Sequence, residues 1–169
     1  MRTDQYKKEI LYRRARGKEL LDKYTEKIFD FFAIETKSTP FLSIEGSDNV
    51  IYTFHEENKT ELIEKYTIQE TEIHKEIKKI KKMKNGSFYV FIDEDWMFCG
   101  AFVIKSLDII RDDFIFGKKV LNDIILISTD ISEEISLDYY EMDNKYWIDI
   151  KKIKATPLSH PSHLDGGKN

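Results

Sequence analysis

Apolar residues recur with a helical period over the first thirty positions of the chain. Between Thr3 and Ala33 they are spaced three, four or seven residues apart, which places them on one face of a single long helix. Thr3 is a suitable N-cap, and Asp4 lies in the first turn, where the helix dipole favours an acidic side chain. Gly17 lies in the middle of this helix and predicts a kink or a close contact with another element.

The next fifty residues predict short strands and a second helix. Residues 41–45 and 50–54 are separated by a Gly-Ser-Asp-Asn sequence, which is typical of a hairpin turn. Residues 60–84 show mostly helical spacing, and the helix begins either at the start of this range or only near Thr71. Asn85–Gly86 favours a cap at the end of that helix over a hairpin turn.

Strand patterns dominate from residue 87 onward. Residues 87–92 and 96–105 flank an acidic three-residue turn and predict an apolar hairpin in the centre of a sheet. Residues 124–128 form a short apolar run that is typical of a buried strand. Alternating apolar positions in residues 135–142 and 145–153 predict a third hairpin, with an Asp-Asn turn between its strands.

The order of these elements predicts one α+β domain. A long N-terminal helix and a middle helix are expected to pack on a mainly antiparallel sheet of hairpins. The domain is expected to span residues 1–154, a length that suits a single hydrophobic core. Residues 155–169, with two prolines, a Gly-Gly pair and little apolar content, are expected to form a disordered tail.

Composition and local sequence exclude several classes of protein. Cys99 is the only cysteine, which excludes an intramolecular disulfide and a multi-cysteine zinc site. The longest apolar run, residues 97–104, is far shorter than the ~20 residues that cross a bilayer. The N-terminal residues contain no apolar signal-peptide core. We therefore expect a cytoplasmic protein that does not associate with a membrane, and its oligomeric state is left open.

The sequence carries no recognisable catalytic motif. It lacks glycine-rich phosphate-binding loops and the G-x-S-x-G nucleophile motif. Cys99 lies among apolar neighbours that keep its thiol protonated and unreactive. We therefore expect a protein that is not an enzyme, with no catalytic residues, no bound metal and no cofactor.

One constellation resembles the site of a metal-dependent nuclease. Asp149-Ile150-Lys151 has the D-x-K form, and Asp138 lies on the expected partner strand. In nucleases of the PD-(D/E)xK type, such carboxylates hold Mg²⁺ and the lysine polarises the attacking water. Solvated charges on one strand face explain this spacing equally well. A Mg²⁺-dependent nuclease is therefore an alternative to a binding protein.

Two basic segments raise a nucleic-acid alternative. Arg13, Arg14 and Arg16 cluster on the first helix, and a lysine-rich stretch covers residues 75–84. Such a chain would act as a phage or mobile-element regulator. Acidic residues interleave with both segments, however, and alternating charge is typical of a solvated helix face. We therefore do not expect nucleic acid as the main partner.

The C-terminal half is acidic and rich in aromatic residues. Residues 1–40 carry ten Lys/Arg against seven Asp/Glu, whereas residues 91–169 carry nine against fifteen. Aromatic rings surrounded by carboxylates suit contact with a basic protein surface, because the ring supplies desolvated area and the acids steer association. Carboxylates that only solubilise a sheet are the competing interpretation. The residues expected to contact a partner are Asp138, Tyr140, Glu141, Asp143 and Trp147.

The segment Asp138-Tyr139-Tyr140 resembles the acid-plus-Tyr-Tyr segment with which colicin-nuclease immunity proteins grip a basic toxin domain. The resemblance covers only this segment, since those proteins are short four-helix bundles, and it implies a mode of recognition. Together with the acidic C-terminal half, it predicts a non-enzymatic bacterial immunity-type inhibitor that neutralises a basic toxin domain, with a nuclease as the expected target.

Overall fold

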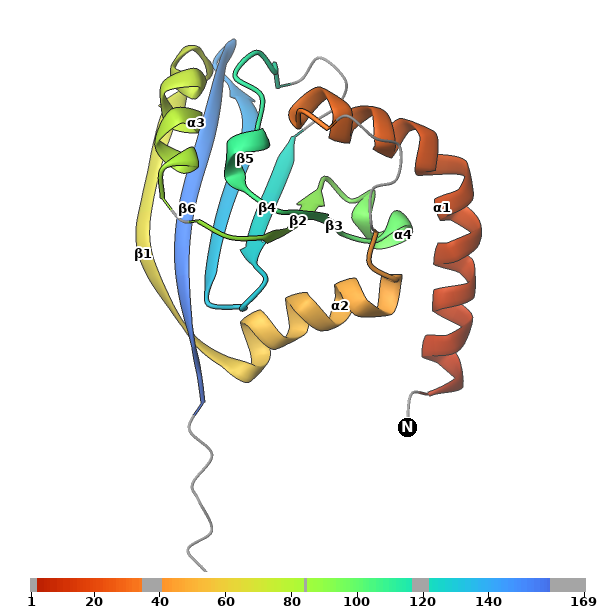
Figure 1. Cartoon of the computed structure of the whole chain (residues 1–169). Coiled ribbons are helices and arrows are strands. Elements are labelled where there is room, and N and C mark those ends of the chain that lie inside the picture. The colour runs from red at the N-terminus through yellow and green to blue at the C-terminus, as the bar shows by residue number, and fades with distance from the viewer. Residues whose placement is uncertain (1–2, 35–40, 84, 117–121, 159–169) are drawn as a thin grey trace, which may run out of the picture.

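Helices pack on both faces of an antiparallel sheet in the computed structural model, which describes residues 3–34, 41–83, 85–116 and 122–158 (Figure 1). The strand order is β1-β6-β5-β4-β2-β3. The strands are β1 (Asn58–Gln69), β2 (Phe88–Ile92), β3 (Phe102–Ile104), β4 (Asp123–Ser128), β5 (Glu133–Met142) and β6 (Lys145–Pro157). The α-helices are α1 (Asp4–Phe31), α2 (Ile44–Tyr52), α3 (Ile73–Lys81) and α4 (Trp96–Cys99). This architecture confirms the predicted α+β class, with a long N-terminal helix, a middle helix and an antiparallel sheet.

The N-terminal helix forms as its sequence predicts. The side chain of Thr3 accepts a hydrogen bond from the backbone N–H of Tyr6, which caps α1. Gly17 makes the predicted close contact, because a Cβ at this position would lie 2.1 Å from the carbonyl oxygen of Phe98. Figure 1 shows that α1 also bends partway along its length. The missing side chain at Gly17 therefore lets α1 approach the backbone of α4.

The first predicted hairpin is wrong, because residues 44–52 form helix α2. Ser43 caps this helix by accepting a hydrogen bond from Gly46 N, 3.0 Å away. Ile44, Ser47 and Val50, three residues apart, form its buried face. The turn-forming residues that suggested a hairpin lie inside the helix, and a π-helical turn, η1 (Thr53–Glu57), follows it.

The middle helix is shorter than residues 60–84. Residues 58–69 form the edge strand β1, which pairs with β6 and is largely exposed. A 3-10 turn, η2 (Glu70–Glu72), then leads into α3, so the helix begins close to the later of the two predicted positions. The predicted cap at Asn85–Gly86 is wrong, because α3 ends at Lys81 and Lys82 is its C-cap.

The second predicted hairpin is present but interrupted. β2 and β3 are antiparallel neighbours, whereas the start of the expected second strand forms α4. Gly100 ends α4 with φ +89°, and a Cβ there would lie 2.0 Å from the carbonyl oxygen of Leu42. Only three residues remain for β3, which a 3-10 turn, η3 (Leu107–Ile109), follows at a short distance.

The third hairpin is confirmed. β5 and β6 are paired over ten residues each, and their turn places Asp143 and Asn144 at φ +55° and +57°. Positive φ at both positions is typical of a type I′ turn, and Asp and Asn tolerate it well. β6 continues to Pro157, so the first residues of the predicted tail belong to the sheet. The rest of that tail, from residue 159, lies outside the described residues.

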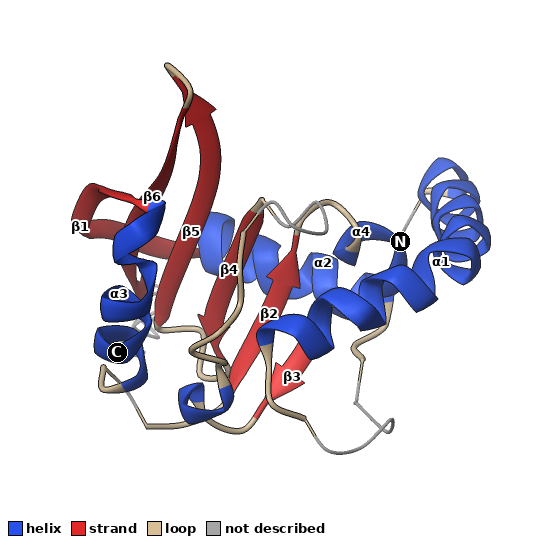
Figure 2. Ribbon diagram, turned by 90° about the horizontal axis from the view of Figure 1, so that it is seen from above, coloured by secondary structure: helices blue, strands red, loops and turns tan. Residues whose placement is uncertain are grey.

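Two hydrophobic cores lie on opposite faces of the sheet. α1 and α3 cover one face, and α2 lies behind the other (Figure 2). Tyr24, Phe31 and Ile77 are fully buried in the first core, and Phe54 and Phe91 in the second. Within the described ranges, no helix is both long and apolar enough to cross a membrane.

Candidate protein-binding surface

The end of the β5–β6 hairpin projects beyond the strands on either side of it (Figure 2). The pairing of β4 with β5 ends at Asp123 and Asp138, and that of β1 with β6 ends at Gln69 and Trp147. Residues 141–146, here called the hairpin tip, extend past both of these ends. All six are exposed. This projection therefore exposes six consecutive residues of the acidic C-terminal half.

The five predicted contact residues all lie on this hairpin, but on different sides of it. Side chains alternate along a strand, so Asp138 and Tyr140 share one face of β5 and Glu141 lies on the other. Trp147 lies directly opposite Tyr140 and therefore on the same face as Tyr140. Asp143 lies in the turn. The hairpin thus carries predicted contacts on both faces and at its end.

A row of aspartates crosses the face that carries Tyr140. Asp123 pairs with Asp138, and Asp138 pairs with Asp149, so the three lie side by side on β4, β5 and β6. The carboxylate of Asp149 accepts hydrogen bonds from the hydroxyls of Thr67, at 2.6 Å, and Tyr140, at 3.2 Å. We call Asp123, Asp138 and Asp149 the aspartate row.

The aspartate row brings three acidic side chains close together. Partial desolvation, followed by the hydrogen bond and negative charge of Asp138, raises the pKa of Asp123 to about 6. Asp138 and Asp149 of the nuclease alternative are thus direct neighbours, and Lys151 lies one alternation further along the same face of β6. No cluster of three or more acids, histidines or cysteines within the described ranges is arranged to hold a metal ion.

Tyr140 and Trp147 form a cross-strand pair next to this row. Both residues are half-buried, so each leaves part of its ring at the surface. The indole nitrogen Nε1 of Trp147 is buried and has no hydrogen-bond partner among the described residues. The pair presents apolar area beside carboxylates, which is the combination expected of a protein contact.

The opposite face of the hairpin bears an aromatic groove of about 510 Å³. It is lined by Glu70, Phe116, Asn122, Tyr139, Tyr140, Glu141 and Tyr146, and we call this set the aromatic groove. The Tyr139 ring is parallel to that of Phe116, with centroids 5.2 Å apart, and to that of Tyr146, with centroids 5.6 Å apart. Tyr146 ends this column, and the residue as a whole is 45% exposed.

Sequence reasoning identified Tyr140 and Glu141 among these lining residues. Strand alternation places Tyr146 opposite Glu141, so Tyr146 could have been found from the register of the hairpin. Glu70 follows β1 and Phe116 lies in the connection before β4, and no local pattern links either residue to the hairpin.

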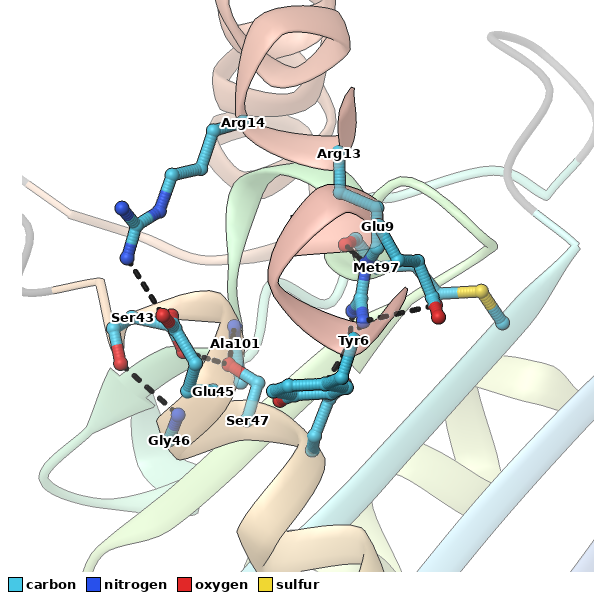
Figure 3. A network of polar contacts seen from close by, with 11 residues as sticks. Tyr6, Glu9, Arg13, Arg14, Ser43, Glu45, Gly46, Ser47, Met97 and Ala101 are labelled. Carbon is cyan, nitrogen blue, oxygen red and sulfur yellow. Dashed lines mark hydrogen bonds and ion pairs between the residues drawn. The ribbon is translucent and has the colours of Figure 1, made fainter. Parts of the chain in front are cut away.

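Two arginines of the basic cluster on α1, Arg13 and Arg14, form ion pairs with acidic residues of α2 (Figure 3). Arg13 is buried and donates two hydrogen bonds of 2.8 Å to the carboxylate of Asp48. Its Nε donates a third, of 2.6 Å, to the carbonyl oxygen of Met97. Arg13 therefore joins helices and is not available to phosphate groups.

The neighbouring cations also have acidic partners. Arg14 pairs with Glu45 at 2.6 Å, and Arg16 pairs with Glu19. On α3, Lys79 pairs with Glu76 at 3.1 Å, and Lys81 pairs with Asp112 at 2.9 Å. These pairs reduce the positive charge that the nucleic-acid alternative requires.

Cys99 is half-buried in the contact between α4 and α1. Its Sγ lies 3.7 Å from the carbonyl oxygen of Gly17. Burial, together with the charge of Asp95, raises the pKa of the Cys99 thiol to about 11, so the thiol is protonated at neutral pH.

Comparisons with protein-family models, with curated proteins and with solved structures give no significant match to this chain.

Proposed function

We propose that this chain is a non-enzymatic binding protein, an immunity-type inhibitor that neutralises a basic toxin domain, with a nuclease as the expected target. The observation that carries the proposal is the hairpin tip, which projects past both neighbouring strands and is exposed at all six positions. Glu141 and Asp143 lie on this tip, and Asp138 lies just behind it. A narrow, acidic projection suits a basic cleft that otherwise receives phosphate groups.

The aromatic pair behind the tip supports a protein partner over a purely electrostatic one. Tyr140 and Trp147 are half-buried, so their rings are held in place before a partner arrives. Rigid aromatic side chains lose little conformational entropy on binding and are frequent hot spots of protein interfaces. The carboxylates around them add orientation and faster association.

The proposal is tested by capturing the partner and then weakening the contact. The immobilised chain is incubated with lysate of the native host, and the bound protein is identified by mass spectrometry. Binding of the purified partner is then measured by calorimetry. We expect a basic partner and a loss of at least about 2 kcal/mol for both Tyr140→Ala and Trp147→Ala. Tyr12→Ala removes an aromatic residue that is 66% exposed on α1 and should leave binding unchanged.

Inhibition is measured in the same system. If the partner cleaves DNA or RNA, adding the chain should stop the cleavage, and the Glu141→Gln/Asp143→Asn variant should require a higher concentration to do so. A partner with an acidic surface, or one that binds the Tyr140→Ala and Trp147→Ala variants as tightly as the unchanged chain, would overturn the proposal.

The nuclease alternative is favoured by one specific observation, the direct pairing of Asp138 with Asp149. Incubating the chain alone with DNA or RNA in Mg²⁺ decides between the two functions. Cleavage that disappears in Asp149→Ala would replace the binding proposal with an enzyme. The absence of cleavage together with capture of a basic partner is the result that we expect.

A further inference from the structure

We propose that the aromatic groove receives an arginine side chain of the partner protein. This inference rests on the proposed function and names the group that its surface recognises. The aromatic column of the groove lies on the face of the hairpin opposite the side chains of Tyr140 and Trp147, so the groove is a second contact surface. Of the five predicted contact residues, Tyr140 and Glu141 line it.

The aromatic column supplies a flat surface for a planar cation. Tyr139 lies between Phe116 and Tyr146, with interplanar angles of 7° and 9°. Tyr146 is the end of the column, and 45% of its surface is exposed. A guanidinium group stacks on such a ring face through cation–π attraction.

Carboxylates supply the matching charge. Glu70 and Glu141 both line the groove, and no lysine or arginine is among its lining residues. Neither glutamate has an ion-pair partner within the described ranges. Burial raises the pKa of Tyr139, and the nearby Glu70, Tyr146 and Glu141 raise it further.

The geometry favours arginine over the other side chains of a basic protein. Arginine is planar, so one face can lie on Tyr146 while its edge donates hydrogen bonds to a carboxylate. Lysine offers a point charge that is strongly hydrated and does not stack as a plane. An acidic or phosphorylated segment would meet two uncompensated carboxylates and is excluded by charge.

The groove is tested on the isolated chain by nuclear magnetic resonance. The ¹⁵N-labelled protein is titrated with N-acetyl-arginine-amide, with the lysine and glutamine analogues as comparison ligands. We expect saturable shifts in residues 139–146 with a dissociation constant on the order of 10 mM, as befits a small, single-residue ligand. The lysine analogue should bind more weakly, and the glutamine analogue should cause no saturable shift.

Two variants with the same change in net charge distinguish binding of arginine in the groove from a general effect of the protein's net charge. Glu70→Gln/Glu141→Gln should weaken arginine binding by about fivefold or more, because it removes both groove carboxylates. Glu61→Gln/Glu94→Gln removes two exposed carboxylates outside the groove and should leave binding unchanged. Equal weakening by both variants, equal binding of the three analogues, or no saturable shift would overturn the inference.

A negative result of this experiment can be distinguished from a negative result of the test of the proposed function. Arginine binding without any captured partner would leave the groove as a cation site and remove the inhibitor proposal. Capture of a basic partner without arginine binding would keep the inhibitor and remove the groove from its contact surface.

Discussion

Arg13 on α1 donates a bidentate pair of hydrogen bonds to the carboxylate of Asp48 on α2, each 2.8 Å long. The side chain of Arg13 is only 10% exposed, so the guanidinium depends on this carboxylate for its charge balance. A third bond, from Nε to the carbonyl oxygen of Met97, extends the link to α4 (Figure 3). One buried cation therefore holds three helices together.

Replacing Asp48 by alanine should destabilise the fold strongly. The substitution removes both hydrogen bonds to the guanidinium and leaves only the 57% exposed carboxylate of Glu9, 3.8 Å away, as its counter-charge. Breaking a buried ion pair costs about 3 to 5 kcal/mol of unfolding free energy. Glu19→Ala is the matched control, because its partner Arg16 is 50% exposed, Glu19 itself is 66% exposed, and the pair should contribute under about 1 kcal/mol. Urea denaturation followed by circular dichroism measures both. Similar losses in the two variants would contradict the role assigned to Arg13.

Gly17→Ala should also destabilise the chain, although alanine is the better helix former by about 1 kcal/mol. The added Cβ would lie 2.1 Å from the carbonyl oxygen of Phe98, which is a backbone atom that cannot rotate away. We expect a net loss of about 2 kcal/mol from the resulting overpacking. Lys18→Ala, at the exposed next position, should be neutral in the same urea titration. A Gly17→Ala variant at least as stable as the original chain would show that α1 and α4 can separate without cost.

The aspartate row should make stability depend on pH. The pKa of Asp123 is raised to about 6, above its ordinary value of 3.8, so the folded state binds this proton more tightly than the unfolded state. The stabilisation is fully present below about pH 4 and is lost as pH rises through about 6. Asp123→Asn should remove this dependence and raise stability at neutral pH by about 0.5 to 1 kcal/mol, as expected for relief of a like-charge cross-strand pair.

His55 also contributes stability that is lost as pH rises, so its contribution must be measured separately from that of Asp123. Its Nε2 lies 3.1 Å from the carboxylate of buried Glu134, and this interaction raises the pKa of His55. Stability from this pair is likewise lost as pH rises through the raised pKa. Urea titrations over this pH range give the free energy of unfolding as a function of pH. Asp123→Asn should abolish one part of this pH dependence, and His55→Gln should abolish the other part. An unchanged pH dependence in Asp123→Asn would contradict the raised pKa of Asp123.

The sequence predicts elements well where one period is uninterrupted. The apolar positions of α1 and the alternation in β5 and β6 both survive in the structure. Residues 44–52 form a helix although Gly46, Ser47 and Asp48 are common in turns, because this helix depends on contacts from elsewhere in the chain. Ser47, for example, accepts a hydrogen bond of 2.7 Å from the backbone N–H of Ala101. Local propensity carries no information about such a distant donor.

Part of the candidate surface could likewise be predicted from the sequence, and part could not. Its acidic and aromatic character and its place on the last hairpin follow from the sequence, because alternation and the turn residues define that hairpin. The groove could not be predicted, because Glu70 and Phe116 reach the hairpin only through the strand order of the sheet. Arg13 belonged to the nucleic-acid alternative because the sequence does not reveal its partner, Asp48, which lies 35 residues away.

Asp143 offers a way to change the charge of the hairpin tip without disturbing its fold. Asp143 has φ +55°, which asparagine adopts readily, so Asp143→Asn should leave stability within about 0.5 kcal/mol of the original. Removing its charge should slow association with the captured basic partner about two- to threefold at low salt, and salt should reduce the difference. Lys145→Gln, on the same tip, should accelerate association by a similar factor. Stopped-flow measurements that move both variants in the same direction would show that the tip does not steer a basic partner.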